Sequence, residues 1–225
     1  MNLEAALHTT DERNEPAYPL AEAARYLRLP TATLRAWLVG AGGRKALISP
    51  AGKRPPVLSF CNLVEAHVLR ALRTHHGVPV RAVRKAIEYA ERELGITQLL
   101  LREDLRSGAG RMFLDRYGEL INLTQSGQLA MKEVLDAHLQ RVVWDSTKLP
   151  VRLHPFVNAS FAGDPRLVAI DPAIGFGRPV LTDAGVSTAT IVSRLDADES
   201  ASDIASDYGI TEEAVKAAVL YERAA

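Results

Sequence analysis

The sequence contains one cysteine, Cys61, among its 225 residues. A single thiol can form neither an internal disulfide nor a metal site built from several thiolates, and it fits a reducing compartment. No apolar run approaches the roughly 18 residues that a membrane-spanning helix needs. The first 17 residues are acidic and lack the apolar core of an export signal, so we expect a flexible tail and a cytoplasmic protein.

Aromatic residues are also scarce, at 6% of the chain, which disfavours a small-molecule pocket lined by aromatic rings. We find no nucleophile elbow, no metal-binding triad and no pair of carboxylates at a catalytic spacing. His154 and Asp171 are isolated from residues that would assist them in catalysis. We therefore expect no enzyme activity, no cofactor and no metal site.

The formal net charge is 0, but the charges are separated along the chain. Residues 18–60 carry seven Lys or Arg against one acidic residue, a local charge of +6. Residues 164–225 carry eleven Asp or Glu against five Lys or Arg, a local charge of −6. This separation predicts two partners of different character, with chance patterning of the surface as the alternative.

Within the basic segment, residues 31–38 (TATLRAWL) are typical of the second helix of a helix-turn-helix. Thr31 is expected to cap this helix through its hydroxyl. Thr33 and Arg35 lie off the apolar side, where small or cationic side chains suit insertion into a major groove. An ordinary amphipathic surface helix is the alternative. The apolar stripe consists of residues at helical spacing, Leu34, Trp37 and Leu38.

The residues before this helix complete the helix-turn-helix pattern. Residues 20–27 (LAEAARYL) predict a first helix with one apolar face. A break follows at residues 28–30, because Pro30 disfavours helical geometry in the residue before it. Two short helices joined by a three-residue turn can share one small core.

A basic hairpin is expected after Gly40, which ends the second helix. Its two short strands are predicted at Leu47-Ile48 and at Val57-Leu58. The turn between them, SPAGKRPP, carries Lys53 and Arg54 at its tip. Such a hairpin is a wing, which places cations against the phosphates of neighbouring DNA.

The stretch YPLAEAARYLRLPTATLRAWL, followed by this hairpin and by a helix beginning at Ser59, resembles the winged helix-turn-helix of MerR-type regulators. The resemblance covers about residues 18–94. It implies a homodimer on a palindromic DNA site, with the second helix near bases and the wing on the backbone. Because Cys61 stands alone, thiolate metal sensing is not expected. The candidate DNA-binding residues are Arg28, Thr31, Thr33, Arg35, Arg44, Lys45, Lys53 and Arg54.

The middle of the chain carries fewer signals. A third helix begins at the cap Ser59, and its apolar stripe includes His67, which we interpret as a core histidine rather than a ligand. Residues 79–94 predict a fourth helix. Residues 96–163 predict a hairpin, a helix ending near Arg141 and an edge strand at VRLHPF, in a region that either pairs subunits or bridges the two ends of the chain.

The acidic C-terminal part predicts a strand at residues 167–170, a glycine-rich loop (GFGRPVLTDAGV) and three short helices. Arg178 is the only cation of the loop. Ser200 and Thr211 are expected to cap the second and third helices, with Gly209 in the turn between them. The last helix begins with Glu212 and Glu213, whose carboxylates would repel the phosphates of DNA. We therefore expect this part to bind a protein.

The segments IDPAIGFGRPVLTDAGVSTATIV and DIASDYGITEEAVKAAVLYE resemble the tri-helical domain of VapB-like antitoxins, over about residues 166–222. TDAGV departs from the usual form of that loop, which leaves its details open. The resemblance implies binding to a PIN-like endoribonuclease toxin, and a cation of the antitoxin can pair with the carboxylates that hold the nuclease's metal. Arg178 and Arg223 are the candidates for that role, with ordinary surface arginines as the alternative. The candidate toxin-binding residues are Arg178, Tyr208, Glu212, Val215, Tyr221 and Arg223.

We therefore predict a mainly α fold with small β hairpins. The expected parts are a flexible tail (1–17), a winged helix-turn-helix DNA-binding domain (18–95), an α+β linker or dimerisation region (96–163) and a tri-helical toxin-binding domain (164–225). The expected function is that of an antitoxin that neutralises a PIN-like ribonuclease and represses its own operon at operator DNA. A one-component regulator with a small-molecule-sensing C-terminal part is the alternative.

Overall fold

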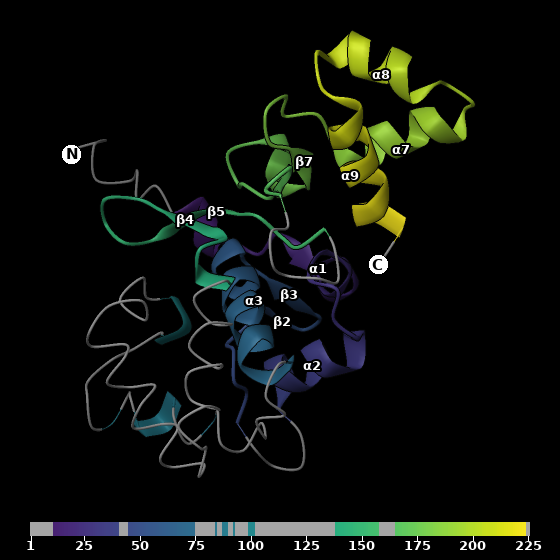
Figure 1. Cartoon of the computed structure of the whole chain (residues 1–225). Helices are drawn as coiled ribbons and strands as arrows, with labels where there is room; N and C mark the ends of the chain where they lie inside the picture. The colour runs from purple at the N-terminus through teal and green to yellow at the C-terminus, as the bar shows by residue number, and fades with distance from the viewer. Residues whose placement is uncertain are drawn as a thin grey trace, which may run out of the picture.

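The computed structural model confirms a mainly helical fold with small antiparallel sheets (Figure 1). No helix of the described part is long and apolar enough to cross a membrane. Most of the fourth helix, the hairpin of the middle region and most of the helix that ends near Arg141 lie outside the described residues, as does Arg44. The structure describes residues 11–40, 45–74, 138–157 and 165–223, together with 84, 87–89, 92 and 99–101.

The predicted helix-turn-helix is present as α1 (Leu20–Tyr26) and α2 (Thr31–Val39). The α2 stripe is buried, with 0% exposure at Leu34 and 2% at Trp37 and Leu38. The expected cap at Thr31 is wrong, because Pro30 occupies the capping position and no described side chain caps the helix. The carbonyl oxygen of Pro30 accepts from the backbone N–H groups of Thr33 and Leu34 instead, at 2.9 and 3.1 Å.

The wing is a three-stranded antiparallel sheet in the order β1-β3-β2. Its strands are β1 (Tyr18–Pro19), β2 (Gly52–Lys53) and β3 (Pro56–Leu58). The strand predicted at Leu47-Ile48 is wrong, because both N–H groups donate to the carbonyl oxygen of Trp37 at the end of α2, at 2.7 and 3.2 Å. The first strand of the hairpin is instead β2, further along the chain. The turn between β2 and β3 is therefore shorter than predicted, and Lys53 and Arg54 lie at its tip.

Helix α3 (Phe60–Thr74) forms the centre of the N-terminal core. The cap at Ser59 is confirmed, since its hydroxyl accepts from the backbone N–H of Asn62 at 3.2 Å, while the Asn62 side chain accepts from the N–H of Ser59. His67 is 1% exposed, which confirms a core histidine. Its Nε2 lies 3.1 Å from the carbonyl oxygen of His138, and burial lowers the pKa of the ring. A short turn, η3 (Leu99–Leu101), packs against α3.

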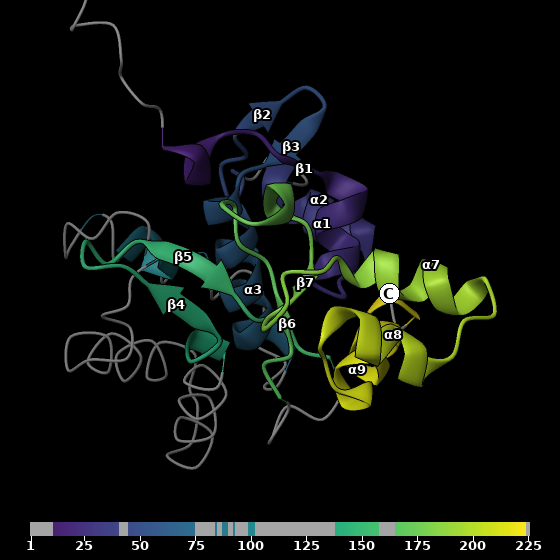
Figure 2. The same cartoon turned by 90° about the horizontal axis from the view of Figure 1, so that it is seen from above.

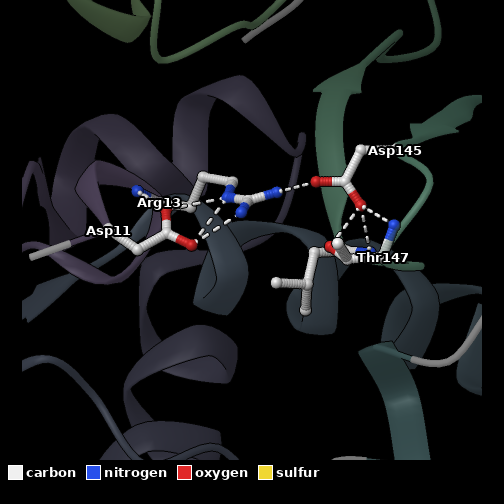
Figure 3. Close-up of polar contacts among 5 residues, drawn as sticks. Asp11, Arg13, Asp145 and Thr147 are labelled. Atoms are coloured by element: carbon white, nitrogen blue, oxygen red, sulfur yellow. Dashed lines mark hydrogen bonds and ion pairs between the residues drawn. The ribbon is translucent and has the colours of Figure 1, made fainter.

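Part of the expected tail is held in place. The turn η2 (Glu12–Asn14) lies near the hairpin of β4 (Val142–Trp144) and β5 (Pro150–Leu153). Arg13 donates to both carboxylate oxygens of Asp11 and, through Nη1, to Oδ2 of Asp145 at 2.6 Å (Figure 3). The other oxygen of Asp145 accepts from the hydroxyl of Thr147 at 2.6 Å. We call these four residues the Arg13 cluster, and they join η2 to the β4–β5 hairpin.

The Arg13 cluster predicts a dependence of stability on pH. The hydroxyl of Thr147, the N–H of Leu149 and Arg13 all donate to Asp145, which holds the pKa of that carboxyl well below its ordinary value of 3.8. The stabilisation is therefore complete above about pH 4 and is lost as the pH falls further. We expect the difference in unfolding free energy between the wild type and Asp145→Asn to shrink from pH 7 to pH 3 in urea denaturation. A difference that stays constant would contradict this, and Asp183→Asn, at an exposed loop position, is the control.

The C-terminal part confirms the three predicted helices, α7 (Thr188–Asp196), α8 (Ala201–Tyr208) and α9 (Glu212–Arg223). Two of the predicted caps are confirmed. The Ser200 hydroxyl accepts from the N–H of Asp203 at 3.1 Å, and the Thr211 hydroxyl accepts from the N–H of Ala214 at 3.1 Å. Gly209 makes the turn with a φ of 63°. These helices pack against the paired strands β6 (Val168–Ala169) and β7 (Val180–Leu181). The turn η5 (Gly175–Gly177) lies between the two strands in the chain.

Two apolar cores, one around α3 and one around α9, meet at the strands. Leu153 at the end of β5 and Ile170 after β6 exchange two backbone hydrogen bonds, of 2.9 and 2.8 Å. These bonds join β5, in the expected middle region, to the end of β6, in the expected C-terminal part. Figures 1 and 2 show α1 between α2 and the group of α7, α8 and α9.

Candidate binding surfaces

The outer side of α2 is the first candidate surface. Thr31 and Arg35 are exposed and Thr33 is half-buried, while the opposite side of the helix is packed into the core. The helix has no acidic residue, so its exposed side adds only positive charge. This arrangement leaves small side chains and one guanidinium outside the core, which is the chemistry that reads base edges in a major groove.

The wing supplies cations beside α2. Lys53 and Arg54 are both exposed at the tip of the β2–β3 hairpin, as predicted from the turn. Lys45 is exposed in the segment that leads to the hairpin, and its carbonyl oxygen accepts from the guanidinium of Arg84. The structure thus places α2 in contact with strand β3 of the wing, and α3 also contacts that strand.

Arg28, a candidate DNA-binding residue, contacts the C-terminal helix α9. It adopts a left-handed backbone, with a φ of 51°, in the turn between α1 and α2. Its Nη2 donates to the carbonyl oxygen of Leu220 at 3.0 Å, and its guanidinium lies 5.8 Å from the centre of the Tyr221 ring. The turn therefore points this cation at α9, where it contributes to contacts within the chain.

Contacts between α1 and α9 join the two ends of the protein. The Tyr221 hydroxyl donates to the carbonyl oxygen of Tyr26 at 3.1 Å, and Arg25 pairs with Glu222 at 2.5 Å. The other oxygen of Glu222 accepts from the hydroxyl of Thr188 at 2.5 Å. Burial raises the pKa of Tyr221 well above its ordinary value, so the hydroxyl stays protonated and able to donate. We call this set of contacts the α1–α9 interface.

The turn η5 is the second candidate surface, and it carries Arg178 at its end. Three consecutive residues are left-handed there, with φ values of 58° at Gly175, 55° at Phe176 and 71° at Gly177. Gly177 is buried against Tyr18 of β1, since a Cβ atom at this glycine would lie 2.3 Å from the tyrosine hydroxyl. Arg178 is exposed, and it forms no ion pair with any residue of the described part.

The other candidate toxin-binding residues divide into buried and exposed ones. Val215 is 1% exposed and Tyr221 is 3% exposed, and both pack inside the C-terminal core, so neither side chain lies on the surface. Tyr208 is half-buried beneath the guanidinium of Arg194, at 5.1 Å. Glu212 is exposed at the start of α9, and Arg223 near its end pairs with Asp196 at 2.9 Å. Among the described residues, no hydrogen bond or ion pair joins Arg178 to any of these five residues.

Sequence reasoning missed two residues that define these surfaces. Phe176 is 96% exposed, the highest value among the exposed large apolar residues of the described part. Its position between two glycines was the available signal, since glycine tolerates the left-handed backbone that such a turn needs. Glu222 connects α9 to both α1 and α7, and no local pattern identifies a contact that spans 197 residues. In the described part, no three His, Cys, Asp or Glu residues converge as a metal site.

Comparisons with known proteins bear on the whole chain. A protein of Mycobacterium tuberculosis named "Putative antitoxin VapB45" is 30% identical over 231 residues, which cover 91% of this chain and 92% of that protein. The chain belongs to the VapB antitoxin family. Because the likeness covers 91% of this chain, it extends well beyond the acidic C-terminal module.

Two further similarities agree with this family. A family profile described as "Protein of unknown function (DUF433)" matches residues 168–221, from β6 to α9. The crystal structure of Rv2018 from Mycobacterium tuberculosis superposes with a TM-score of 0.71 at 27% identity, covering 91% of this chain and 97% of that one. The arrangement of parts described above is therefore shared with a solved protein over nearly its full length.

Proposed function

We propose that this member of the antitoxin family neutralises a PIN-like ribonuclease by direct binding, and that the ribonuclease is encoded beside it. The observation that carries the proposal is the exposed Arg178 on a structured turn of the acidic C-terminal module. The curated relative's name as an antitoxin supports a toxin partner. An antitoxin acts on another protein, which agrees with a C-terminal module whose charge of −6 disfavours nucleic acid.

The chemistry of inhibition follows from the target. Nucleases of this kind hold divalent metal through clustered carboxylates, and oxygen ligands of that type pair equally well with a guanidinium. Arg178 is fully charged at any physiological pH and presents planar donors that match a carboxylate in two-point contact. Inserted among the carboxylates, it would occupy the place of the metal and remove the nuclease's ability to activate water.

We further propose that the same chain represses its operon as a homodimer, with α2 in the major groove and the wing on the backbone. The exposed Thr31 and Arg35 on α2 support this role, as do Lys53 and Arg54 on the wing. Arg28 is left out of the proposed DNA surface, because it contacts α9. Two copies reading a palindromic site is the arrangement expected of MerR-like domains, which residues 18–94 resemble.

Co-purification of the chain with the neighbouring ribonuclease, followed by an RNase assay, tests the proposed function. We expect the wild type to bind and inhibit, and Arg178→Ala to inhibit roughly 30-fold less well, the loss typical of an arginine hot spot. Arg166→Ala removes the same charge from another exposed position of the module and should inhibit normally. Failure of the wild type to bind or inhibit the ribonuclease would overturn the proposal. Point variants are preferred to deletion of residues 164–225, which would break the Leu153–Ile170 hydrogen bonds and the α1–α9 interface.

A further inference from the structure

Phe176 combines two unfavourable features that the fold nevertheless maintains. A phenylalanine in the left-handed region, here at φ 55° and ψ 35°, is strained relative to ordinary backbone. Its ring is also left in water, at 96% exposure. Single exposed apolar residues are common on protein surfaces, so exposure by itself carries no conclusion. Strain and exposure at one residue instead indicate a side chain that is positioned for contact with something outside the chain.

The turn beneath Phe176 is held by hydrogen bonds on both sides. The N–H of Gly177 donates to the carbonyl oxygen of Ile174, and the N–H of Arg178 donates to that of Gly175, each at 3.1 Å. Before the turn, the side chain of Asp171 accepts from the N–H of Ala173 at 3.0 Å.

Two other elements fix the same turn from below. Arg152 of β5 pairs with Asp171 at 2.9 Å, and Tyr18 of β1 packs against Gly177. Because two strands hold the turn in addition to its own hydrogen bonds, the ring is presented by a rigid support. A group ordered before binding loses little conformational entropy when a partner arrives, so it contributes more affinity than a mobile one.

The charge of Arg178, close to Phe176 in the chain, indicates what kind of partner contacts the ring. Arg178 follows Phe176 by two residues and is also exposed, so one short turn carries both an exposed aromatic ring and an exposed guanidinium. Aromatic and arginine side chains dominate binding energy at the centres of protein interfaces. A cation of this kind is complementary to a partner that carries clustered carboxylates, which is the toxin of the proposed function.

We propose that Phe176 is the main apolar contact of this antitoxin with its toxin, filling an apolar pocket beside the acidic centre that Arg178 enters. This inference rests on the proposed function and adds the residue that supplies affinity. Arg178 provides the positive charge that pairs with the carboxylates of the nuclease. The ring of Phe176 provides apolar surface that becomes buried on binding and stabilises the complex. The left-handed backbone at Phe176 is then explained as the cost of keeping its ring exposed for the partner.

The test is the affinity of the full chain for the neighbouring PIN-like ribonuclease, measured by calorimetry. We expect Phe176→Ala to weaken binding roughly tenfold or more, as at an interface hot spot. Phe176→Asn removes the ring with a residue that adopts the left-handed backbone readily, so it should weaken binding equally without added strain. Val143→Ala shortens another exposed apolar side chain, 39% exposed on β4, and should bind like the wild type. Thermal melts of all variants should stay close to that of the wild type, because the ring lies outside both apolar cores.

The outcomes separate this inference from the proposed function. If the wild type binds and both Phe176 variants bind equally well, the role of Phe176 is wrong and the toxin assignment stands. If the wild type does not bind the ribonuclease, both proposals fall. Sedimentation of the chain alone addresses a second copy as the occupant: a dimer that dissociates in Phe176→Ala, with toxin affinity unchanged, would assign the turn to self-association and overturn the inference.

Discussion

Replacing Gly177 by alanine is expected to lower the free energy of unfolding by about 2–4 kcal/mol. Two effects add at this position. The residue has a φ of 71°, which an L-amino acid adopts only with strain. A Cβ atom would also lie 2.3 Å from the hydroxyl of Tyr18 and 3.1 Å from the ring carbon that bears it, so β1 or the turn η5 must move. Urea denaturation of the full chain measures the sum.

Two further variants separate strain from collision. Gly209 has a similar φ of 63°, but no atom of the described part lies within 4 Å of the place that a Cβ atom would take, so Gly209→Ala should cost only the strain, about 1 kcal/mol. Adding Tyr18→Phe to Gly177→Ala removes the colliding oxygen and should recover roughly half of the loss. Equal effects of Gly177→Ala and Gly209→Ala would show that β1 does not press on the turn.

The second large effect is expected in DNA binding. Arg35→Ala should weaken binding to the operator by about 1–3 kcal/mol if its guanidinium reads a guanine edge from α2. Lys53→Ala and Arg54→Ala should act differently, because the proposed function places these wing cations on phosphates rather than on bases. Each should lower the slope of log affinity against log salt by roughly 0.9, with similar losses on specific and unrelated DNA. Fluorescence anisotropy over a salt series, on operator and random duplexes, measures both quantities.

The control for these variants is Arg166→Ala, which removes one exposed cation from the acidic module and should leave operator affinity nearly unchanged. Unchanged binding after substitution of Arg35, Lys53 and Arg54 together would remove the N-terminal domain from the proposed function. It would leave toxin neutralisation untouched, since the two activities are assigned to different surfaces.

Features that depend on neighbours in the chain were predictable. The spacing of Leu34, Trp37 and Leu38 identified the buried side of α2, because a helix places such positions on one face. The caps at Ser59 and Ser200 followed from short polar side chains directly before apolar periodic runs. In each case the interaction lies within a few residues, so local sequence determines it.

Features that depend on contacts between distant segments of the chain were not predictable from the sequence. Strand β1 pairs with β3 across about 40 residues, and nothing in Tyr18 or Pro19 specifies that partner. Arg28 has the composition of a DNA contact, yet the left-handed turn directs it to α9. Tyr221 was assigned to a partner surface because it ends the antitoxin-like pattern, but helical spacing equally predicts a core residue, and the structure buries it.

The α1–α9 interface connects the part of the chain proposed to bind DNA with the part proposed to bind the toxin, so the two binding equilibria can be coupled. Its members Tyr26 and Arg25 belong to the helix-turn-helix, and its members Tyr221 and Glu222 belong to the acidic module. If toxin binding changes the operator affinity by some factor through this contact, operator DNA must change the toxin affinity by the same factor. Expression of the operon would then respond to the ratio of toxin to antitoxin, because the occupancy of the operator would depend on how much toxin is bound.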